Sequence, residues 1–436
     1  MNVLLFMSDE HNPFYSSPYG HRQLDTPNMQ RLADTGTLYE NAYCPSPLCV
    51  PGRSAFLSGR RVHQIQQYNN CQLIHHEHPG YGSVLAKQGI HTAYIGKLHT
   101  YNASEFFGFS EMFSKEAAKD GDGCLSRQPL AIRHYAAARF PDFGPRAAAF
   151  RDDTAYVDRC LRWLQETAPG LNKPWLFVLN TLAPHFPHHV NQPLWDKYAG
   201  DLPAAGLDRA RHPYADDLRQ HFQTDRITEE QIRGQRRAYL GCVDWVDQQL
   251  GRVLDTLAKT GQLDDTVVIY TSDHGEMLGK FGMWWKCSLY EDSVRVPLII
   301  SGPGFGGGQR VTTPVDLLDL QATLFDIFNA QRPADWVGQP LLSIASDRTV
   351  FSEYHGHGTR ASSYLIRKGD WKLIWCAAAP HLLFNLAEDP DELHDLATVR
   401  PEKLAELEAE LRRICDPELE QARAEAFIQR QLAAAS

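Results

Sequence analysis

Apolar residues along the chain fall into short continuous runs, separated by longer stretches in which apolar residues recur every three or four positions. The continuous runs are typical of strands buried on both faces, and the recurrent spacing is typical of amphipathic helices. Buried strands are therefore predicted at residues 2–8, 90–96, 175–181, 266–273 and 296–303. Helices are predicted at residues 26–36, 54–61, 82–89, 155–167, 236–261 and 315–328. This alternation predicts an α/β fold in which helices cover both faces of a large, mostly parallel sheet.

The pattern changes after about residue 345. Short runs bounded by turn residues predict antiparallel strands at 349–356, 362–376 and 381–397. We therefore expect a large domain over residues 1–345 and a small α+β domain with a short antiparallel sheet over residues 346–436.

Three segments are harder to place. A charged amphipathic stretch at 401–432 predicts one terminal helix, which would be either a surface cap or a contact in a homo-oligomer. Residues 105–146 and 198–226 show no clear period. We interpret these two segments as insertions near the functional site.

Composition limits the class of protein but points to no functional site. The 436 residues are 43% hydrophobic and carry a formal net charge of −10, which is typical of a globular protein and argues against nucleic acid as a partner. The apolar run near the start is too short to cross a membrane and lacks the features of a secretory leader, so no membrane partner is expected. The nine cysteines are scattered singly, which does not suit a disulfide framework. These features predict a cytoplasmic protein.

Polar side chains follow four of the predicted strands at the point where each strand ends. Ligands of open parallel sheets bind beyond the carboxyl ends of the strands, so these side chains are candidates for one site. They are Asp9, Glu10, Lys97, His99, His185, Asp273 and His274. A single aspartate after a strand is most often a helix cap or a turn residue. Two such ends, with a Glu or a His directly after the Asp, favour a divalent cation, which prefers oxygen and imidazole ligands.

Ordinary interpretations compete at single positions. Taken alone, Lys97 could be a solvated charge and His185 a loop residue. Cys44 is expected to be a small buried residue. The adjacent tryptophans 284–285 are expected to pack in the core, although they could also line a pocket beside Lys286.

The stretch CVPGRSAFLSGR, from Cys49 to Arg60, carries the strongest pattern in the chain. Its Cys-x-Pro-x-Arg core, followed by Leu, Gly and Arg, resembles the signature of the formylglycine-dependent sulfatases, within the alkaline-phosphatase-like superfamily. The segments SDE, GKLH, PHFP, SDHGE and WWKCSLYED occur in that family's order, and LIRKGDWKLIW and LFNLAEDPDE resemble its C-terminal domain. The helix predicted to begin near Ser54 would add partial positive charge beside the cysteine.

The resemblance implies a nucleophile that is made after translation. A formylglycine-generating enzyme would oxidise Cys49 to formylglycine, and the hydrated aldehyde would attack the sulfur of a small-molecule sulfate ester, as in an arylsulfatase. Asp9, Asp273 and His274, together with residue 49, look like the ligands of a divalent metal, calcium by resemblance, with manganese or magnesium as alternatives. Glu10 stands where other members have Asp or Gln, so its direct ligation of the metal is left open.

The resemblance assigns the remaining roles in the same way. Arg53 and Lys97 look like the groups that hold the hydroxyl groups of formylglycine, and His99 looks like the base that takes a proton from one of them. His185 and Lys286 look like the pair that contacts the sulfate and the leaving oxygen, one of them protonating the departing alkoxide.

Three other functions compete with a sulfatase. A phosphonate or phosphate monoester hydrolase would use the same nucleophile, and members of that branch resemble this chain in the Asn that follows the modified Cys by 21 residues, here Asn70 (49 + 21), a candidate substrate-binding residue. The presence of His99 and of the GKLH and PHFP segments favours sulfate. A non-catalytic relative would have lost a key position, and none is lost. A thiol hydrolase that pairs Cys49 with His99 would work without metal. Aryl, choline-like and sugar sulfates are not separated by these residues.

Overall fold

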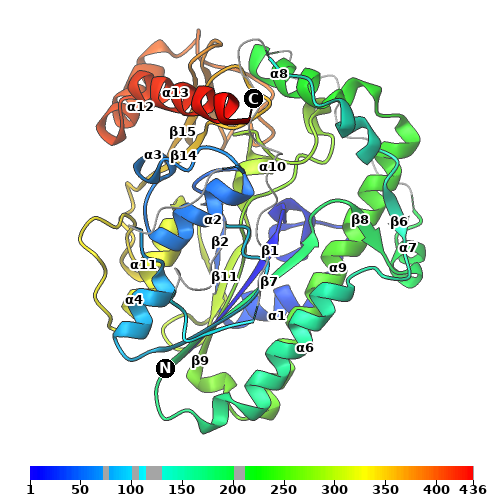
Figure 1. Ribbon diagram of the computed structural model, residues 1–436, viewed down its shortest axis with the longest axis vertical. Coiled ribbons are helices and arrows are strands. Elements are labelled where there is room, and N and C mark those ends of the chain that lie inside the picture. The colour runs from blue at the N-terminus through cyan, green and yellow to red at the C-terminus, as the bar shows by residue number, and fades with distance from the viewer. Residues whose placement is uncertain (72–77, 101–107, 114–129, 201–211, 436) are drawn as a thin grey trace.

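A computed structural model of the protein describes residues 1–71, 78–100, 108–113, 130–200 and 212–435. Its central element is an eight-stranded sheet with the strand order β12-β2-β11-β9-β1-β7-β4-β5. Strands β1, β7, β9 and β11 lie in the middle of the molecule (Figure 1). The middle of the sheet is parallel and consists of β9 (Thr266–Ser272), β1 (Asn2–Asp9), β7 (Trp175–Pro184) and β4 (His91–Gly96). The predicted α/β fold with a mostly parallel sheet is confirmed.

The fifth predicted strand runs in the opposite direction. β11 (Leu298–Ser301) pairs antiparallel with β9 and with β2 (Thr37–Tyr39). The edges of the sheet are β12 (Gln309–Val311) and β5 (Glu111–Met112). An apolar run predicts that a strand is buried but does not give its direction, so the reversal was not visible in the sequence pattern.

The first strand shows why both faces of the sheet are buried. Val3 and Leu5 belong to one core cluster, Leu4 and Phe6 belong to another, and all four side chains are fully buried. Successive side chains of a strand point to opposite faces. A continuous apolar run therefore fills two cores at once.

Helices cover the two faces of the sheet (Figure 1). The core that contains Leu4 also receives side chains from α1 (Pro27–Thr35), α6 (Arg151–Glu166) and α9 (Glu229–Lys259). The core that contains Val3 receives side chains from α2 (Cys49–Ser58), α4 (Tyr81–Lys87) and α11 (Leu317–Ile327). Among the described residues, no helix combines the length and the apolar character needed to span a bilayer.

Short elements occupy the connections. They are α3 (Val62–Ile65), α7 (Gln192–Lys197), α8 (Pro213–Phe222), α10 (Glu291–Val294), η3 (His134–Arg139), β3 (Ala42–Tyr43), β6 (Phe143–Pro145), β8 (His188–Val190), β10 (Arg295–Val296) and β13 (Val315–Asp316). The segment 198–226, which shows no clear period in the sequence, thus contains helix α8. The rest of the two predicted insertions lies partly outside the described residues.

The sequence pattern predicts that helix α2 begins near Ser54. In the structure, the helix begins at Cys49. Leu48 is the extended N-cap residue, and Pro51 occupies the third helical position. A proline is tolerated there because the first N–H groups of a helix have no intrahelical partner. The partial positive charge of the helix terminus therefore acts on residue 49 itself.

The C-terminal region forms its own antiparallel sheet, as predicted. β14 (Thr349–Tyr354), β15 (Ser363–Lys368), β16 (Trp371–Cys376) and β17 (Leu382–Asn385) pair in chain order. Leu407 and Leu411 of α12 (Pro401–Ile414) share one hydrophobic cluster with this sheet.

The predicted single terminal helix was wrong. The stretch forms two helices, α12 and α13 (Pro417–Ala435), because Pro417 cannot continue the hydrogen-bonding pattern of the first. In α13, Ala424 packs with Ala55 and Tyr68, close to the helix that begins with Cys49. Within this chain, the last helix is therefore a cap on the large domain.

Candidate active site

The four parallel strands deliver the predicted polar residues to one end of the sheet. Asp9 ends β1, and Asp273 and His274 directly follow β9, which pairs with β1 in register. On the other side of β1, His185 follows β7 and Lys97 follows β4. These strand ends therefore lie at one edge of the sheet.

Four side chains form a compact group of donors at this end of the sheet. Asp9, Cys49, Asp273 and His274 are buried, and each offers an atom within 4.8 Å of the atoms of the other three. His274 Nε2 lies 3.3 Å from Cys49 Sγ, 3.6 Å from Asp273 Oδ2 and 3.9 Å from Asp9 Oδ1. Asp9 Oδ1 is buried and has no hydrogen-bond donor among the described residues. Two carboxylates, one of which has an unsatisfied oxygen, and an imidazole fit a divalent cation.

Arg53 bonds to the carboxylates of both Asp9 and Asp273 and so links them. Its Nε donates to Asp273 Oδ2 at 2.8 Å and its Nη2 lies 3.2 Å from Asp9 Oδ2. Its Nη1 donates to Lys97 O at 3.0 Å and to Asn180 Oδ1 at 2.9 Å. Burial alone would lower the pKa of the guanidinium, but the two aspartates raise it, so Arg53 stays charged. The arginine fixes the carboxylates in place and offsets their charge.

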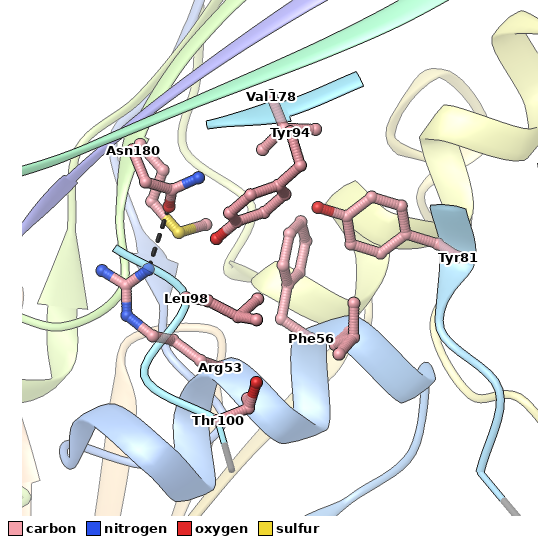
Figure 2. A pocket seen from close by; sticks show the side chains of 10 residues that line it. Arg53, Phe56, Tyr81, Tyr94, Leu98, Thr100, Val178 and Asn180 are labelled. Atoms are coloured by element: carbon pink, nitrogen blue, oxygen red, sulfur yellow. Dashed lines mark hydrogen bonds between the residues drawn. The ribbon is translucent and has the colours of Figure 1, made fainter. Parts of the chain in front are cut away.

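Arg53 also lines a small cavity (Figure 2). Its volume is about 20 Å³, and Phe56, Tyr94 and Leu98 form much of its wall. The guanidinium group points away from these rings toward Asn180, which bonds it. Sequence reasoning missed Asn180. The signal that could have found it is a polar residue inside the apolar run 175–181.

Lys97 reaches the same group of donors from β4. Its Nζ contacts Asp9 Oδ2 and lies 3.7 Å from Cys49 Sγ. The turn into Lys97 requires Gly96, which has a φ of +99° and approaches the backbone of Asn180 so closely that a Cβ would collide with it. Burial lowers the pKa of Lys97, but the aspartate and the thiol outweigh burial and raise it, so the ammonium is retained.

Cys49 is 1% exposed and surrounded by positive charge. Burial alone would raise the pKa of its thiol. Lys286, Lys97 and His274 outweigh burial and hold that pKa well below its usual range. An environment of this kind stabilises negative charge on whatever oxygen or sulfur residue 49 carries. Cys44 is buried and its thiol is free, as expected, so Cys49 is not tied up in a disulfide.

Glu10 lies outside the group of four donors. Its backbone has a φ of +64°, which turns the side chain toward another pair of residues. Its Oε2 lies 3.1 Å from Lys286 Nζ and 3.3 Å from His185 Nε2. Burial raises the pKa of Glu10 well above its usual range, an effect that Lys286 opposes and Glu276 reinforces. The side chain of Glu10 thus contacts Lys286 and His185, the pair predicted to contact the substrate.

His185 and Lys286 are in direct contact, with 2.5 Å between His185 Nε2 and Lys286 Nζ. Burial, together with Lys286 and Lys97, lowers the pKa of His185 to about 3, so its ring is neutral and accepts from the ammonium group. Glu276 holds the lysine loop, because its Oε1 accepts from the backbone N–H of Trp285 at 2.6 Å. Glu276 is a second residue that sequence reasoning missed, although it stands in the SDHGE segment.

Two predicted residues are placed differently from the rest. Asn70 Oδ1 accepts a 3.2 Å hydrogen bond from the backbone N–H of Val50, so it braces the start of α2. His99 has a φ of +45°, and its Nδ1 has no hydrogen-bond partner among the described residues. No hydrogen bond or ion pair within the described part of the chain joins His99 to the other site residues.

The chain is similar to known proteins over most of its length. The model of the Sulfatase family matches residues 1–330, and the model described as N-sulphoglucosamine sulphohydrolase, C-terminal, matches residues 279–422. A choline-sulfatase from Rhizobium meliloti (strain 1021) is 30% identical over 91% of this chain and 82% of its own length. Arylsulfatase K from Danio rerio is 28% identical over 95% of this chain and 84% of its own length.

Solved structures share the fold over nearly the whole chain. A protein in complex with its substrate D-glucosamine-2-N,6-O-disulfate superposes with a TM-score of 0.77 at 22% identity, covering 95% of this chain and 97% of the other. A phosphonate monoester hydrolase of Agrobacterium radiobacter superposes with a TM-score of 0.75 at 24% identity, covering 94% of this chain and 95% of the other. The family match runs through the strands and loops that surround Cys49, and it shows that the chain belongs to the sulfatase family of sulfuric ester hydrolases.

Proposed function

We propose that this protein hydrolyses sulfate monoesters, as an arylsulfatase does, with a formylglycine made from Cys49 as the nucleophile. The observation that carries the proposal is the place of Cys49. It is the first residue of α2, it is buried, and its sulfur lies within 4 Å of both His274 Nε2 and Lys97 Nζ. A nucleophile needs this kind of surrounding charge to become reactive near neutral pH.

We assign the metal to Asp9, Asp273 and His274, with residue 49 beside it. Calcium is the ion that the family resemblance implies, and manganese or magnesium, which also accept aspartate together with histidine, are the alternatives. A bound divalent cation would stabilise the negative charge that develops on the nucleophile and on the sulfate group. Arg53 and Lys97 would hold the two hydroxyl groups of residue 49.

The first step transfers the sulfuryl group to residue 49. One hydroxyl of the hydrated aldehyde loses its proton to solvent, its oxygen forms a bond to sulfur, and the bond from sulfur to the ester oxygen breaks. Lys286 is placed to give the departing alkoxide its proton. Burial alone would lower the pKa of Lys286, but Cys49, Glu10 and Asp9 raise it, so the lysine is protonated while the adjoining His185 is neutral.

The second step releases sulfate. The remaining hydroxyl of residue 49 gives up its proton, its electron pair forms the carbonyl double bond, and the carbon–oxygen bond to sulfate breaks. Water then adds to the aldehyde and restores the nucleophile. We assign the proton acceptor to His99, whose Nδ1 is without a partner in the described residues. An ordinary serine or cysteine has no second hydroxyl and would keep the sulfuryl group.

We assign Glu10 to positioning and not to metal binding. It is not one of the four donors around Cys49, and although it forms a second group of possible ligands with Asp9 and His185, its carboxylate already contacts both Lys286 and His185. Asn70 would act in the same indirect manner, through the backbone of Val50. Substrate binding is thus left to His185 and Lys286 among the predicted residues.

The proposal is tested on protein whose conversion at residue 49 has been quantified. Trypsin releases residues 32–53 as one peptide, and mass spectrometry of this peptide reports the exchange of the thiol for an aldehyde. The converted protein should hydrolyse an aryl sulfate, and activity should scale with the converted fraction. Activity that is independent of conversion and survives chelation would support the thiol hydrolase instead.

The alternative function is phosphonate or phosphate monoester hydrolysis by the same nucleophile. The superposition on the phosphonate monoester hydrolase of Agrobacterium radiobacter keeps this alternative open. Sulfate and phosphonate esters are both tetrahedral oxyanions, so some cross-reactivity is expected. A kcat/KM for an aryl phosphonate monoester that exceeds the value for the aryl sulfate by orders of magnitude would make the sulfatase proposal wrong.

We also propose a domain boundary near residues 345 and 346. It lies between the end of the match to the Sulfatase family and the first strand of the C-terminal sheet. A cytoplasmic location, a formylglycine-generating enzyme as maturation partner and a homo-oligomeric state stay predictions.

A further inference from the structure

Lys286, the proposed proton donor, lies between two residues with unusual backbone geometry. Trp285 has a φ of +64° and Cys287 has a φ of +78°. Residues other than glycine rarely adopt this left-handed conformation, so both must be held in it by their surroundings. The contacts that hold Trp285 and Cys287 therefore also fix the direction in which Lys286 points.

On the N-terminal side of Lys286, the loop is bound by the segment that follows β9. The backbone N–H of Trp285 donates to Glu276 Oε1 at 2.6 Å. The carbonyl of Trp285 accepts from the N–H of Met277 at 2.8 Å. These two bonds hold Trp285, and Cys287 is held by other parts of the chain.

Cys287 connects the lysine loop to two separate regions. Its backbone N–H donates at 2.9 Å to the carbonyl of Pro47, two residues before the proposed nucleophile. Its side chain is buried, and its Sγ lies 3.7 Å from His357 Nε2. His357 lies between β14 and β15, in the C-terminal region. Cys287 therefore joins the loop of Lys286 to the nucleophile loop on one side and to the C-terminal region on the other.

The contact between Cys287 and His357 joins two neutral groups and has a defined direction. Burial raises the pKa of the Cys287 thiol to about 12. Burial and the charge of Arg133 hold the pKa of His357 well below its usual range. Arg133 Nη1 lies 3.4 Å from His357 Nε2, and a guanidinium can only donate. Nε2 is therefore the acceptor, and the thiol of Cys287 donates its hydrogen bond to it.

His357 is itself fixed by its surroundings. It is buried, its carbonyl accepts from Tyr354 Oη at 2.5 Å, and its ring meets Phe222 edge-on with centroids 5.9 Å apart. The same turn also touches the loop before the nucleophile, since a Cβ on Gly356 would come within 3.0 Å of Leu48 Cδ2. This turn of the C-terminal region thus packs against both loops that carry the proposed reacting groups.

We propose that Cys287 and His357 are a positioning pair, through which the C-terminal region aligns Lys286 with the leaving oxygen of the substrate. Neither side chain needs to touch the substrate. This inference rests on the proposed function, in which Lys286 protonates the departing alkoxide. It makes the C-terminal region necessary for that proton transfer as well as for stability.

The test compares phenyl sulfate with 4-nitrophenyl sulfate on the full-length converted protein. Phenolate depends more on protonation than 4-nitrophenolate does, so the ratio of kcat/KM for the phenyl ester to that for the nitrophenyl ester reports the proton transfer. Both esters are measured on one preparation, so the folded and converted fractions cancel. Lys286→Met should lower the ratio on the order of 100-fold. Cys287→Ala and His357→Phe should each lower it roughly 5- to 20-fold, mainly through kcat, because a misplaced acid loses part of its effect.

Three further variants separate positioning from a general loss of packing. Cys287→Ser keeps a hydrogen-bond donor and should restore most of the ratio. The double variant Cys287→Ala/His357→Phe should lower the ratio no further than either single change, because the two residues act through one contact. The matched control is Cys160→Ala, which removes another fully buried thiol, from α6, and should leave the ratio unchanged.

The possible failures are distinguishable. An equal fall for both esters in Cys287→Ala would assign Cys287 a purely structural role and overturn the inference. Effects that multiply in the double variant would also overturn it, because the two residues would then act separately. An unchanged ratio in Lys286→Met would instead overturn the role assigned to Lys286, and native converted protein that cleaves neither ester would overturn the proposed function itself.

Discussion

Two clusters of buried charge in this protein have opposite designs. In the cluster between the C-terminal sheet and the large domain, Lys372 Nζ donates to Glu291 at 2.8 Å and to Glu392 at 2.7 Å. The other oxygen of Glu291 accepts from Tyr43, and the other oxygen of Glu392 accepts from the backbone N–H of Glu291. Every carboxylate oxygen is satisfied.

The active-site cluster is left incomplete. Asp9 Oδ1 and Glu10 Oε1 are buried without a hydrogen-bond donor among the described residues, and three cations surround the thiol of Cys49. A buried acceptor without a partner costs free energy, so it persists only where something else completes it. The Lys372 cluster therefore stabilises the folded protein by its own contacts, whereas the Asp9 cluster leaves acceptors that a bound ligand would satisfy.

The sharpest test of this difference is Cys49→Ala. Hydrolysis of aryl sulfate should fall on the order of 10⁴-fold or more, as it does when the nucleophile of another hydrolase is removed. The free energy of unfolding should change by no more than about 1–2 kcal/mol, because only one small side chain is lost. Steady-state kinetics and urea unfolding measure the two quantities. A large loss of stability would contradict the separation of the two clusters.

Lys372→Met should have the converse effect. It leaves Glu291 and Glu392 buried without their cation, which should cost about 3–5 kcal/mol of unfolding free energy. The free energy is measured by urea unfolding, with kcat on an aryl sulfate measured at a temperature where the variant is folded. A control is Lys403→Met, whose lysine lies in an ion pair on the surface of α12. Unchanged stability of Lys372→Met would show that the cluster is not structural.

Metal binding should stabilise only the active-site cluster. At a hundredfold excess over its dissociation constant, calcium should raise the unfolding free energy by about 2.7 kcal/mol. Thermal unfolding in calcium, manganese and magnesium would rank the ions without any activity assay. Asp273→Asn should abolish the increase and Lys372→Met should preserve it. A calcium effect that persists in Asp273→Asn would place the ion elsewhere.

The buried pair of His63 and Glu353 should give the smallest effect, a dependence of the unfolding free energy on pH. Burial alone would lower the pKa of His63, but Glu353 raises it, and the His63 Nδ1 to Glu353 Oε1 distance is 3.0 Å. Because the folded-state pKa is the higher one, this contribution to stability is complete below about pH 6.5, the value for an unfolded histidine, and is lost as pH rises through the folded-state pKa. The stability difference between native protein and His63→Gln should therefore be larger at pH 6 than at pH 9. A difference that grows with pH would contradict this pairing.

The sequence predicted most of the fold because each strand run is apolar without interruption, and most of the site because polar residues stand at the strand ends. Three features needed the structure. The direction of β11 depends on its neighbours, the start of α2 depends on a proline in the first turn, and the bracing roles of Asn180 and Glu276 depend on long-range contacts. The turn of Glu10 toward Lys286 also required coordinates, because a side chain at the end of a strand can point to either of two partners.

The burial of Cys49 would set a time limit on the oxidation proposed for it. At 1% exposure, the thiol at the start of α2 is closed to any second protein once the chain has folded. Helix α13, which packs against α2 and α3, begins at Pro417, which lies 368 residues after Cys49 (417 − 49). At about 5–20 residues per second, synthesis of that stretch takes roughly 20–80 seconds. The oxidation proposed for Cys49 therefore competes with translation and folding, and slower synthesis should increase the converted fraction.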